Sequence, residues 1–166
     1  ITGYITKVAN TTYGNFYLKD ATGEVYVYGT LDANGQTKQW ANMGIKEGDI
    51  VTVVGPKSSY KGSPQMVNVS VEKHTPVTDV TVSEFLAKSD NSSVYYRIKG
   101  NVANIKNTTY GNFDIVDETG SVYVYGLTNG WGGPSKAFES FGINEGDNLT
   151  LIGVRSSYKG TAQVGS

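Results

Sequence analysis

Two short motifs that each occur twice carry the side chains best suited to contact a ligand. The stretch NTTYGNF stands at Asn10–Phe16 and again at Asn107–Phe113, and SSYKG stands at Ser58–Gly62 and again at Ser156–Gly160. Each motif supplies a tyrosine ring, and the second also supplies a lysine. Aromatic rings stack on nucleic-acid bases, for about 1–3 kcal/mol per base, and they also pack on the C–H faces of sugars. A lysine beside the ring favours a ligand that carries phosphates.

The histidine and cysteine residues on which a catalytic triad depends are scarce in this chain. It has no cysteine, and His74 is its only histidine, so neither a serine nor a cysteine triad is expected. His74 stands beside Thr-Pro and is interpreted as a solvated linker residue. The recurring aspartates (Asp20 and Asp117, Asp49 and Asp147) fall in predicted tight turns. Neither a twelve-residue calcium loop nor a GxxxxGK phosphate loop occurs. We therefore expect no enzymatic activity, no cofactor and no metal site.

The composition favours strands over helices. The 166 residues include 21 glycines and 12 tyrosines but only 4 prolines, which is typical of short strands joined by tight turns. The net charge of −1 and the pI of about 5.8 argue against a chain that is basic throughout. No apolar stretch approaches the roughly 20 residues of a membrane span. Because the first residue is Ile1, we expect a mature product or an excised piece.

The repetition extends far beyond the two motifs. Residues 3–29 align with 100–126 at an offset of 97, and GEVYVYG matches GSVYVYG within this range. After a one-residue insertion, GIKEGD matches GINEGD and KSSYKG matches RSSYKG at an offset of 98. Residues 1–75 and 95–166 therefore form two copies of one unit. Between them, residues 76–94 are expected to be a linker, with a short helix marked by the capping-box spacing of Thr81 and Glu84.

The order of predicted elements within one copy indicates a known barrel. In the first copy, strands are expected at 4–9, 16–20, 24–28, 50–55 and 65–72, with a short helix at 38–43 and a loop at 56–64. Three strands, a helix and two strands in about 75 residues is the order of an OB-fold, a five-stranded Greek-key barrel. The fold class is therefore all-β with short helices, in the form of two tandem OB-folds.

The repeated segments also resemble a family. The stretches YRIKGNVANIKNTTYGNFDIVDETGSVYVYGL and GIKEGDIVTVVGPKSSYKGSPQMVN look like OB-fold domains of secreted proteins and lipoproteins in Bacteroidetes-type bacteria. The resemblance covers nearly the whole chain. It implies the OB-fold, a role in binding nucleic acid, and an extracytoplasmic location, in the periplasm or at the cell surface, as part of a lipoprotein or secreted protein. A fold hosts many functions, so the resemblance is specific for the fold alone.

The outer face of strands two and three, flanked by the loops between strands one and two and between strands four and five, is the usual ligand platform of an OB-fold. Alternation along the strands is expected to point Phe16, Leu18, Val25 and Val27 inward, with Phe113 and Ile115 in the second copy. The candidate binding residues are then Tyr13, Tyr17, Lys19, Tyr26, Tyr28, Tyr60 and Lys61 in the first copy, and Tyr110, Tyr123, Tyr125, Tyr158 and Lys159 in the second.

The two copies are not equivalent on this face. Asp114 and Val116 stand where the first copy has Tyr17 and Lys19, so the first copy is expected to bind anionic or aromatic ligands better. Trp131, in the NGWGGPS stretch, is either a separate contact or packed on the end of the barrel. The second copy ends in QVGS, so its fifth strand is expected to be short. An unpaired edge there would allow self-association through a neighbouring molecule.

Three functions remain open at the level of the sequence. The first is a binding module for single-stranded nucleic acid, with Lys19, Lys57 and Lys61 around one cleft. The second is an accessory module that binds carbohydrate, as an oligosaccharide, or peptide. The third is a structural spacer or assembly domain whose repeats provide reach. For the loop tyrosines, the alternative to ligand contact is a structural role in which Tyr13 folds over Tyr60 and holds two loops together.

Overall fold

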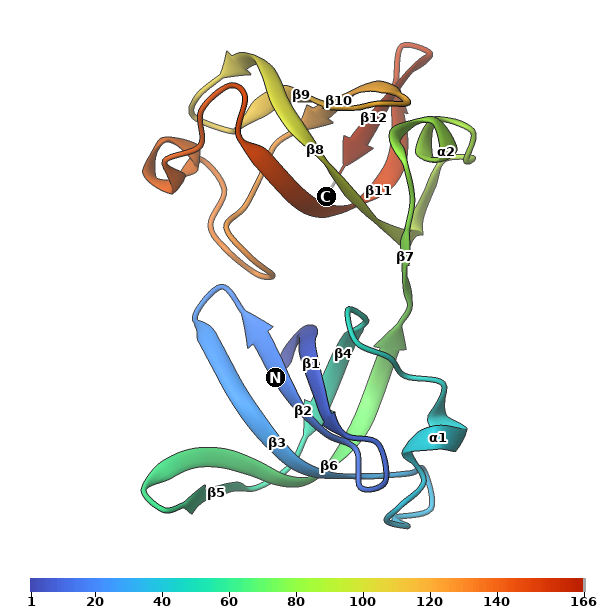
Figure 1. The fold of residues 1–166 in the computed structure, drawn as a ribbon, viewed down its shortest axis with the longest axis vertical. Helices are drawn as coiled ribbons and strands as arrows, with labels where there is room; N and C mark the ends of the chain where they lie inside the picture. Colours follow the sequence, from blue (N-terminus) through green and yellow to red (C-terminus); the bar gives the residue numbers. More distant parts are fainter. Residues whose placement is uncertain (166) are drawn as a thin grey trace. The chain divides into compact units, whose positions relative to one another are not determined.

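The chain forms two compact units in the computed structural model, which describes residues 1–165. The first unit comprises Ile1–Pro76 together with Gly130–Gly133, and the second comprises Val77–Asn129 with the described residues from Pro134 onward. Strands make up most of both units (Figure 1). Within residues 1–165, no helix has the length and apolar character that a membrane span requires.

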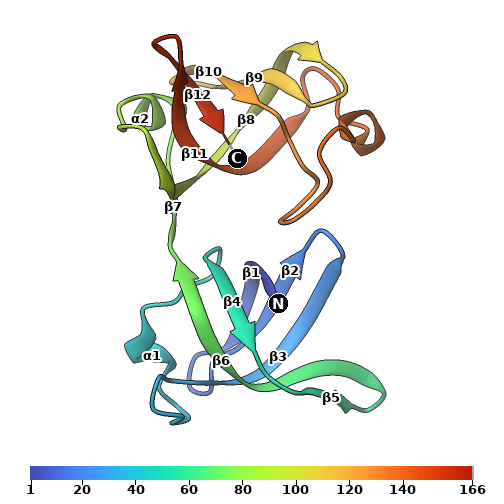
Figure 2. The same ribbon diagram turned by 180° about the vertical axis from the view of Figure 1, so that it is seen from behind.

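The first unit is a closed barrel of five strands with one further strand attached. Its elements in chain order are β1 (Thr2–Asn10), β2 (Asn15–Asp20), β3 (Gly23–Leu31), α1 (Trp40–Met43), β4 (Ile50–Val54), β5 (Lys57–Tyr60) and β6 (Ser63–Thr75). Antiparallel pairing joins β3 to β2, β2 to β1, β1 to β4 and β4 to β6. The parallel pair β3–β6 closes the ring (Figure 2). This topology confirms the predicted OB-fold.

The second unit repeats this topology. Its elements are β7 (Val77–Asp79), α2 (Val82–Leu86), β8 (Asn91–Asn107), β9 (Asn112–Asp117), β10 (Gly120–Tyr125), the 3₁₀ helix η1 (Phe138–Phe141), β11 (Asn148–Tyr158) and β12 (Thr161–Gly165). Strands β8, β9, β10, β12 and β11 form the barrel, closed between β11 and β8, with β10 and β12 parallel. The short fifth strand that the sequence predicts is present as β12.

The cores follow the predicted alternation. Phe16, Leu18 and Val27 are fully buried in the first barrel, and Phe113 and Ile115 are fully buried in the second. Each such residue contributes about 1.5–3 kcal/mol by leaving water. Val25, also expected inside, is only partly buried and packs against the edge of the first core.

The short helix after the third strand closes one end of each core. Trp40, the first residue of α1, is buried, and its ring centroid lies 5.5 Å from that of Phe16. In the second unit Phe138 takes the same place, 5.8 Å from the ring centroid of Phe113. An aromatic residue at this point of each copy therefore fills the barrel beneath the NTTYGNF loop.

Helix α2 belongs to the core of the second unit. The capping box predicted from Thr81 and Glu84 is confirmed, with both reciprocal hydrogen bonds present. Val82 and Phe85 are fully buried among the residues of the second barrel, and the Val82 amide donates to Asp117 Oδ2 at 2.9 Å. This segment thus packs on the barrel by an apolar face that its short sequence does not reveal.

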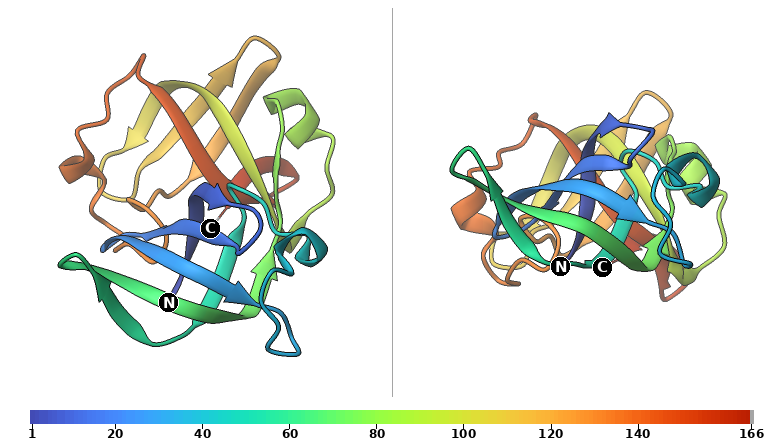
Figure 3. Two further views of the ribbon diagram at one scale, coloured as in Figure 1. Left: turned by 60° about the horizontal axis from the view of Figure 1, so that its bottom comes forward. Right: turned by 90° about the horizontal axis from the view of Figure 1, so that it is seen from below.

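The stretch expected as a loop at 56–64 is a hairpin, so this prediction was wrong. Residues Lys57–Tyr60 form β5, which pairs antiparallel with the start of β6. Lys61 and Gly62 both have positive φ, of 49° and 85°, as the two central residues of a tight hairpin turn require. The other views in Figure 3 show this hairpin extending beyond the body of the first barrel.

His74 is not a solvated linker residue, which corrects the interpretation of the sequence. Strand β6 continues to Thr75 and pairs His74 opposite Val51. This places His74 Nε2 at 2.8 Å from Oδ2 of Asp49, a carboxylate that is completely buried. The histidine therefore helps to satisfy a buried acidic group, as buried charges require. In the second unit the corresponding Asp147 is exposed.

Candidate functional site

The NTTYGNF loop is held by side-chain to backbone hydrogen bonds. Asn10 Oδ1 accepts from the amides of Thr12 and Tyr13, both at 2.9 Å. Asn107 Oδ1 accepts in the same way from Thr109 and Tyr110, at 3.0 and 2.8 Å. Such Asx turns are a local alternative to strand pairing, and they explain why each repeat begins with asparagine.

The motif requires a glycine at its fifth position because an aromatic ring from inside the barrel lies directly against it. Gly14 has a φ of +68°, and a Cβ added to it would lie 2.6 Å from Cε3 of Trp40. Gly111, with a φ of +80°, is placed in the same way against the Phe138 ring. No other residue combines the left-handed backbone with the absence of a side chain.

The main chain on either side of this glycine is also tied to the third strand. The Tyr13 carbonyl accepts from the Thr30 amide at 2.9 Å, and Asn15 Oδ1 accepts from the Gly29 amide at 2.8 Å. The motif therefore has a structural task for its asparagines, its glycine and its phenylalanine. The tyrosine side chain is left outside that framework.

The Tyr13 ring lies beneath a lysine that sequence reasoning missed. Tyr13 is 45% exposed, and Lys38 Nζ lies 5.4 Å from its ring centroid. In the second unit Tyr110 is 43% exposed, and Lys136 Nζ lies 5.5 Å from its ring centroid. The signal available in the sequence was the lysine at the same place in both copies, in TKQW and SKAF.

The hairpin tips carry a second pair of the same kind. Tyr60 and Tyr158 are exposed, and Lys61 Nζ and Lys159 Nζ each lie 5.4 Å from the centroid of the preceding ring. Among the ring contacts of residues 1–165, none joins Tyr13 to Tyr60. The structural alternative in which these two rings hold the loops together is therefore not what the fold shows.

On the outer face of the first barrel, Tyr17 stands opposite Tyr26 across β2 and β3. Their ring centroids are 5.0 Å apart at an interplanar angle of 49°, and both residues are half-buried. Tyr28, two residues further along β3, is 54% exposed. Lys19 is exposed and stands opposite Glu24, so its charge is partly offset. Two of these three rings support each other, and the third is open to solvent.

The same face in the second barrel has a different chemistry. Asp114, which replaces Tyr17, accepts a hydrogen bond from Asn104 Nδ2 at 2.9 Å. Tyr123 lies beneath Lys106, whose Nζ is 5.0 Å from the ring centroid. Tyr125 is 60% exposed, like its counterpart in the first barrel. An anionic ligand would thus meet a carboxylate where the first barrel presents a ring.

Strand pairing extends the outer face of the first barrel from β3 to the hairpin formed by β5 and β6. Tyr26 stands opposite Gln65 of β6, and Gln65 stands opposite Ser58 of β5. Because side chains alternate along a strand, Tyr60 lies on the same side of the hairpin as Ser58. The tyrosine-bearing face of the first unit, defined as Tyr13, Tyr17, Tyr26, Tyr28 and Tyr60, therefore runs across β2, β3, β6 and β5, with Tyr13 in the connection between β1 and β2.

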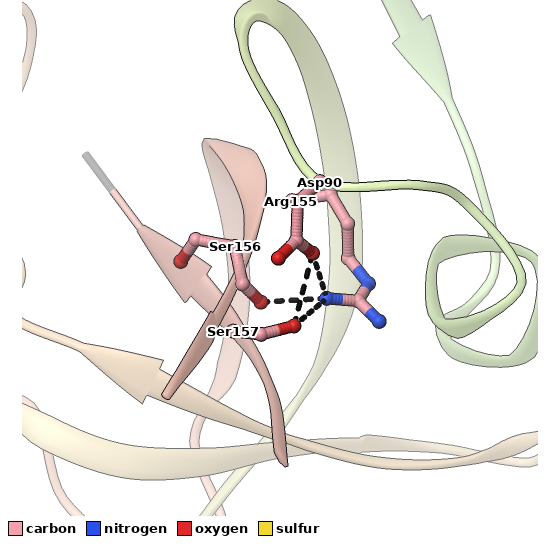
Figure 4. Close-up of polar contacts among 4 residues, drawn as sticks. All are labelled: Asp90, Arg155, Ser156 and Ser157. Atoms are coloured by element: carbon pink, nitrogen blue, oxygen red, sulfur yellow. Dashed lines mark hydrogen bonds and ion pairs between the residues drawn. The ribbon is translucent and has the colours of Figure 1, made fainter. Parts of the chain in front are cut away.

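Hydrogen bonds around Arg155 stabilise the hairpin formed by β11 and β12 in the second unit. Arg155 Nη1 lies 2.6 Å from Asp90 Oδ1 and donates to the Ser156 carbonyl at 2.6 Å and to Ser157 Oγ at 3.0 Å (Figure 4). Ser157 Oγ also donates to Asp90 Oδ1 at 3.0 Å. Arg155 is thus engaged internally, whereas Lys57, its counterpart in the first unit, is exposed.

The two carboxylates with a shifted pKa, Asp20 and Asp117, lie where tight turns begin. Hydrogen bonds from the Thr22 hydroxyl and from nearby amides lower the pKa of Asp20. Burial raises the pKa of Asp117, but hydrogen bonds from Thr119 and from nearby amides outweigh it, so this pKa is also lowered. Among residues 1–165 there is no cluster of three or more His, Cys, Asp or Glu side chains suited to a metal ion. One shallow hollow, beside α1, includes none of the candidate tyrosines.

The fold makes this chain a tandem OB-fold protein. The known structures that resemble it are only distantly similar. A murine DNA-binding protein bound to double-stranded DNA is similar over 99% of this chain and 91% of its own, at 14% identity and a TM-score of 0.41. The tetrameric p202 HIN2 domain is similar over 99% of this chain and 86% of its own, at 11% identity and a TM-score of 0.42. Scores this low carry no information about the ligand of this chain.

No family model matches the chain, and no curated protein matches it. The resemblance to Bacteroidetes-type domains therefore stays a prediction.

Proposed function

We propose that this chain is a non-catalytic module that binds single-stranded nucleic acid on the tyrosine-bearing face of its first unit. The observation that carries the proposal is the set of exposed rings with lysines beside them on the face that OB-folds commonly use. Stacking is tolerant of sequence because every base has a π-face, and lysines add attraction to the backbone. The extracytoplasmic location implied by the family resemblance is part of this proposal.

The first unit is the stronger binder in this proposal. Its face presents Tyr17 and Lys19, where the second presents Asp114 and Val116. A carboxylate repels a phosphate backbone, and a valine offers no ring on which to stack. The second unit keeps Tyr125 and Tyr158 exposed, so it contributes weaker contacts.

Fluorescence anisotropy with a labelled oligothymidylate tests the proposal. An oligonucleotide of about 15 nucleotides is suitable, because one OB-fold covers roughly 4–16 nucleotides. At low salt we expect saturable binding that weakens between about 50 and 200 mM salt. An unchanged anisotropy up to about 100 µM protein, the weak end of non-specific affinities, would rule the proposal out.

Tyr28→Ala and Tyr125→Ala form a matched pair for locating the site. Both residues are exposed at equivalent positions of the two copies, so neither change should disturb a core. Loss of one stacked base at Tyr28 should weaken binding by about 1–3 kcal/mol. Tyr125→Ala should have a smaller effect, and equal effects would contradict the preference for the first unit.

A carbohydrate ligand is the second candidate, favoured by one observation. Tyr28 and Tyr125 are exposed rings, and the cation–π contacts found in residues 1–165 do not involve them. Uncharged rings of this kind suit the C–H face of a sugar. Binding to a glycan array that is independent of salt, with no response to oligonucleotides, would favour this candidate.

A further inference from the structure

Lysine occupies an unusual backbone conformation at four places in the described chain. Six residues other than glycine have positive φ, and four of them are lysines: Lys38, Lys61, Lys136 and Lys159, with φ between 49° and 60°. The left-handed region disfavours long side chains, and asparagine, aspartate or glycine is the usual choice there. The backbone alone therefore does not explain why lysine stands at these positions.

All four of these lysines share one contact. Each places Nζ 5.4–5.5 Å from the centroid of an exposed tyrosine ring. The four Tyr–Lys pairs are Tyr13 with Lys38, Tyr60 with Lys61, Tyr110 with Lys136 and Tyr158 with Lys159. None of these lysines has an ion-pair partner within residues 1–165. Each pair thus presents an aromatic ring and an uncompensated positive charge at one point of the surface.

The two pairs of the first unit lie at opposite ends of its tyrosine-bearing face. The Tyr13 carbonyl is bonded to Thr30, near the end of β3, whereas Tyr60 stands opposite Ser63. Strands β3 and β6 run parallel, and Tyr26 of β3 stands opposite Gln65 of β6. Two residues earlier on each strand, Ser63 therefore lies beside Glu24. Six residue steps of β3 separate Glu24 from Thr30, or roughly 20 Å.

We infer that the Tyr–Lys pairs are the phosphate-contacting ends of the proposed binding face, and that Lys38 and Lys136 are binding residues. This inference rests on the proposed function. In each pair the ring offers a stacking surface for a base and the lysine contacts the adjoining phosphate. A ligand that meets both pairs of one unit is an extended polyanion with planar groups, on the order of four to six nucleotides long.

Lys38→Asn provides the decisive variant, because it removes the charge and suits the left-handed backbone better than lysine does. The matched control is Lys46→Asn, the same charge change at an exposed lysine of the first unit that does not belong to a Tyr–Lys pair. Binding of the labelled oligothymidylate is measured by anisotropy across a salt series, and stability is measured by urea unfolding of the same full-length variants.

We expect Lys38→Asn to weaken binding about threefold to tenfold at low salt and to reduce the slope of log K against log salt by about 0.7. Its stability should equal or exceed that of the wild type. Lys46→Asn should change the slope by much less. Tyr13→Phe, which keeps the ring, should bind nearly as well as the wild type, and Tyr13→Ala should not.

Three results would overturn the inference in different ways. If the wild type binds and Lys38→Asn behaves like Lys46→Asn, the lysine only packs on its ring and the proposed function survives without this contact. If Lys38→Asn lowers stability while leaving the salt slope unchanged, the pair is structural. Absence of binding by the wild type removes the proposed function and this inference together.

Discussion

The substitution Gly14→Ala tests why the NTTYGNF loop has the sequence it has. Gly14 has a φ of +68°, a conformation that costs an alanine about 1–2 kcal/mol. The new Cβ would also lie 2.6 Å from Trp40 Cε3 and 3.0 Å from Thr30 Cβ. Relief of that overlap requires movement in a packed core, which costs about 1–3 kcal/mol more. The expected loss of stability is therefore about 2–5 kcal/mol.

Gly44→Ala separates the two contributions. Gly44 has nearly the same φ, +67°, but a Cβ there would meet no atom within 4 Å. This substitution should cost only the conformational part, about 1–2 kcal/mol. The difference between the two variants then measures the packing of the loop against Trp40.

Trp40 itself provides the signal for the measurement. It is one of two tryptophans in the chain, so a Trp131→Phe background leaves Trp40 as the sole tryptophan reporting on the first barrel. Urea unfolding followed by its fluorescence gives the free energy of unfolding for each variant. Equal losses for Gly14→Ala and Gly44→Ala would refute the reasoning, because the packing against Trp40 would then impose no requirement for glycine.

Substitutions at three further positions test the same structure. Asn10→Ala removes the acceptor of two loop amides and should lower the stability of the first unit by about 1 kcal/mol in urea unfolding. His74→Ala takes a partner from the buried Asp49 carboxylate and should cost about 1–3 kcal/mol, whereas His74→Gln, which keeps a donor, should cost less. Because the pKa of Asp117 is lowered by folding, its stabilising effect is fully present above the ordinary aspartate pKa of 3.8 and is lost as the pH falls through the folded-state pKa. Asp117→Asn should therefore lower stability at neutral pH and flatten the loss on acidification, and an unchanged pH profile of urea unfolding would contradict this.

The fold could be predicted from the sequence because local signals agreed with one another. Alternation in GEVYVYG and GSVYVYG, turn residues at fixed places and an internal repeat all pointed to the same order of strands. Phe16 and Phe113 were correctly expected in the core, since a small barrel fills its interior with apolar side chains. The capping box of Thr81 and Glu84 was visible because it depends on residues only three apart.

Whether the tyrosines are free to contact a ligand depends on side-chain contacts that the sequence does not show. Tyr13 and Tyr60 were identified as surface residues, but the sequence left open whether their rings met each other. Lys38 lies over the Tyr13 ring although it is 25 residues further along the chain, and its backbone has a left-handed conformation there. Side-chain contacts between separate connections depend on how the barrel closes, and no local pattern encodes that closure.

By itself, the sequence determined that the chain is a pair of OB-folds and that it has no cysteine and a single histidine, and it left one tyrosine in each NTTYGNF copy without an obligatory structural task. Tertiary structure decided the roles of His74, Lys38 and Gly14. His74 meets Asp49 only because β6 runs on to Thr75 alongside β4, and Gly14 meets Trp40 only because α1 closes the barrel beneath the loop. These roles depend on contacts between residues far apart in the chain, which the sequence does not show, whereas the strands and turns depend on residues that are neighbours in the sequence.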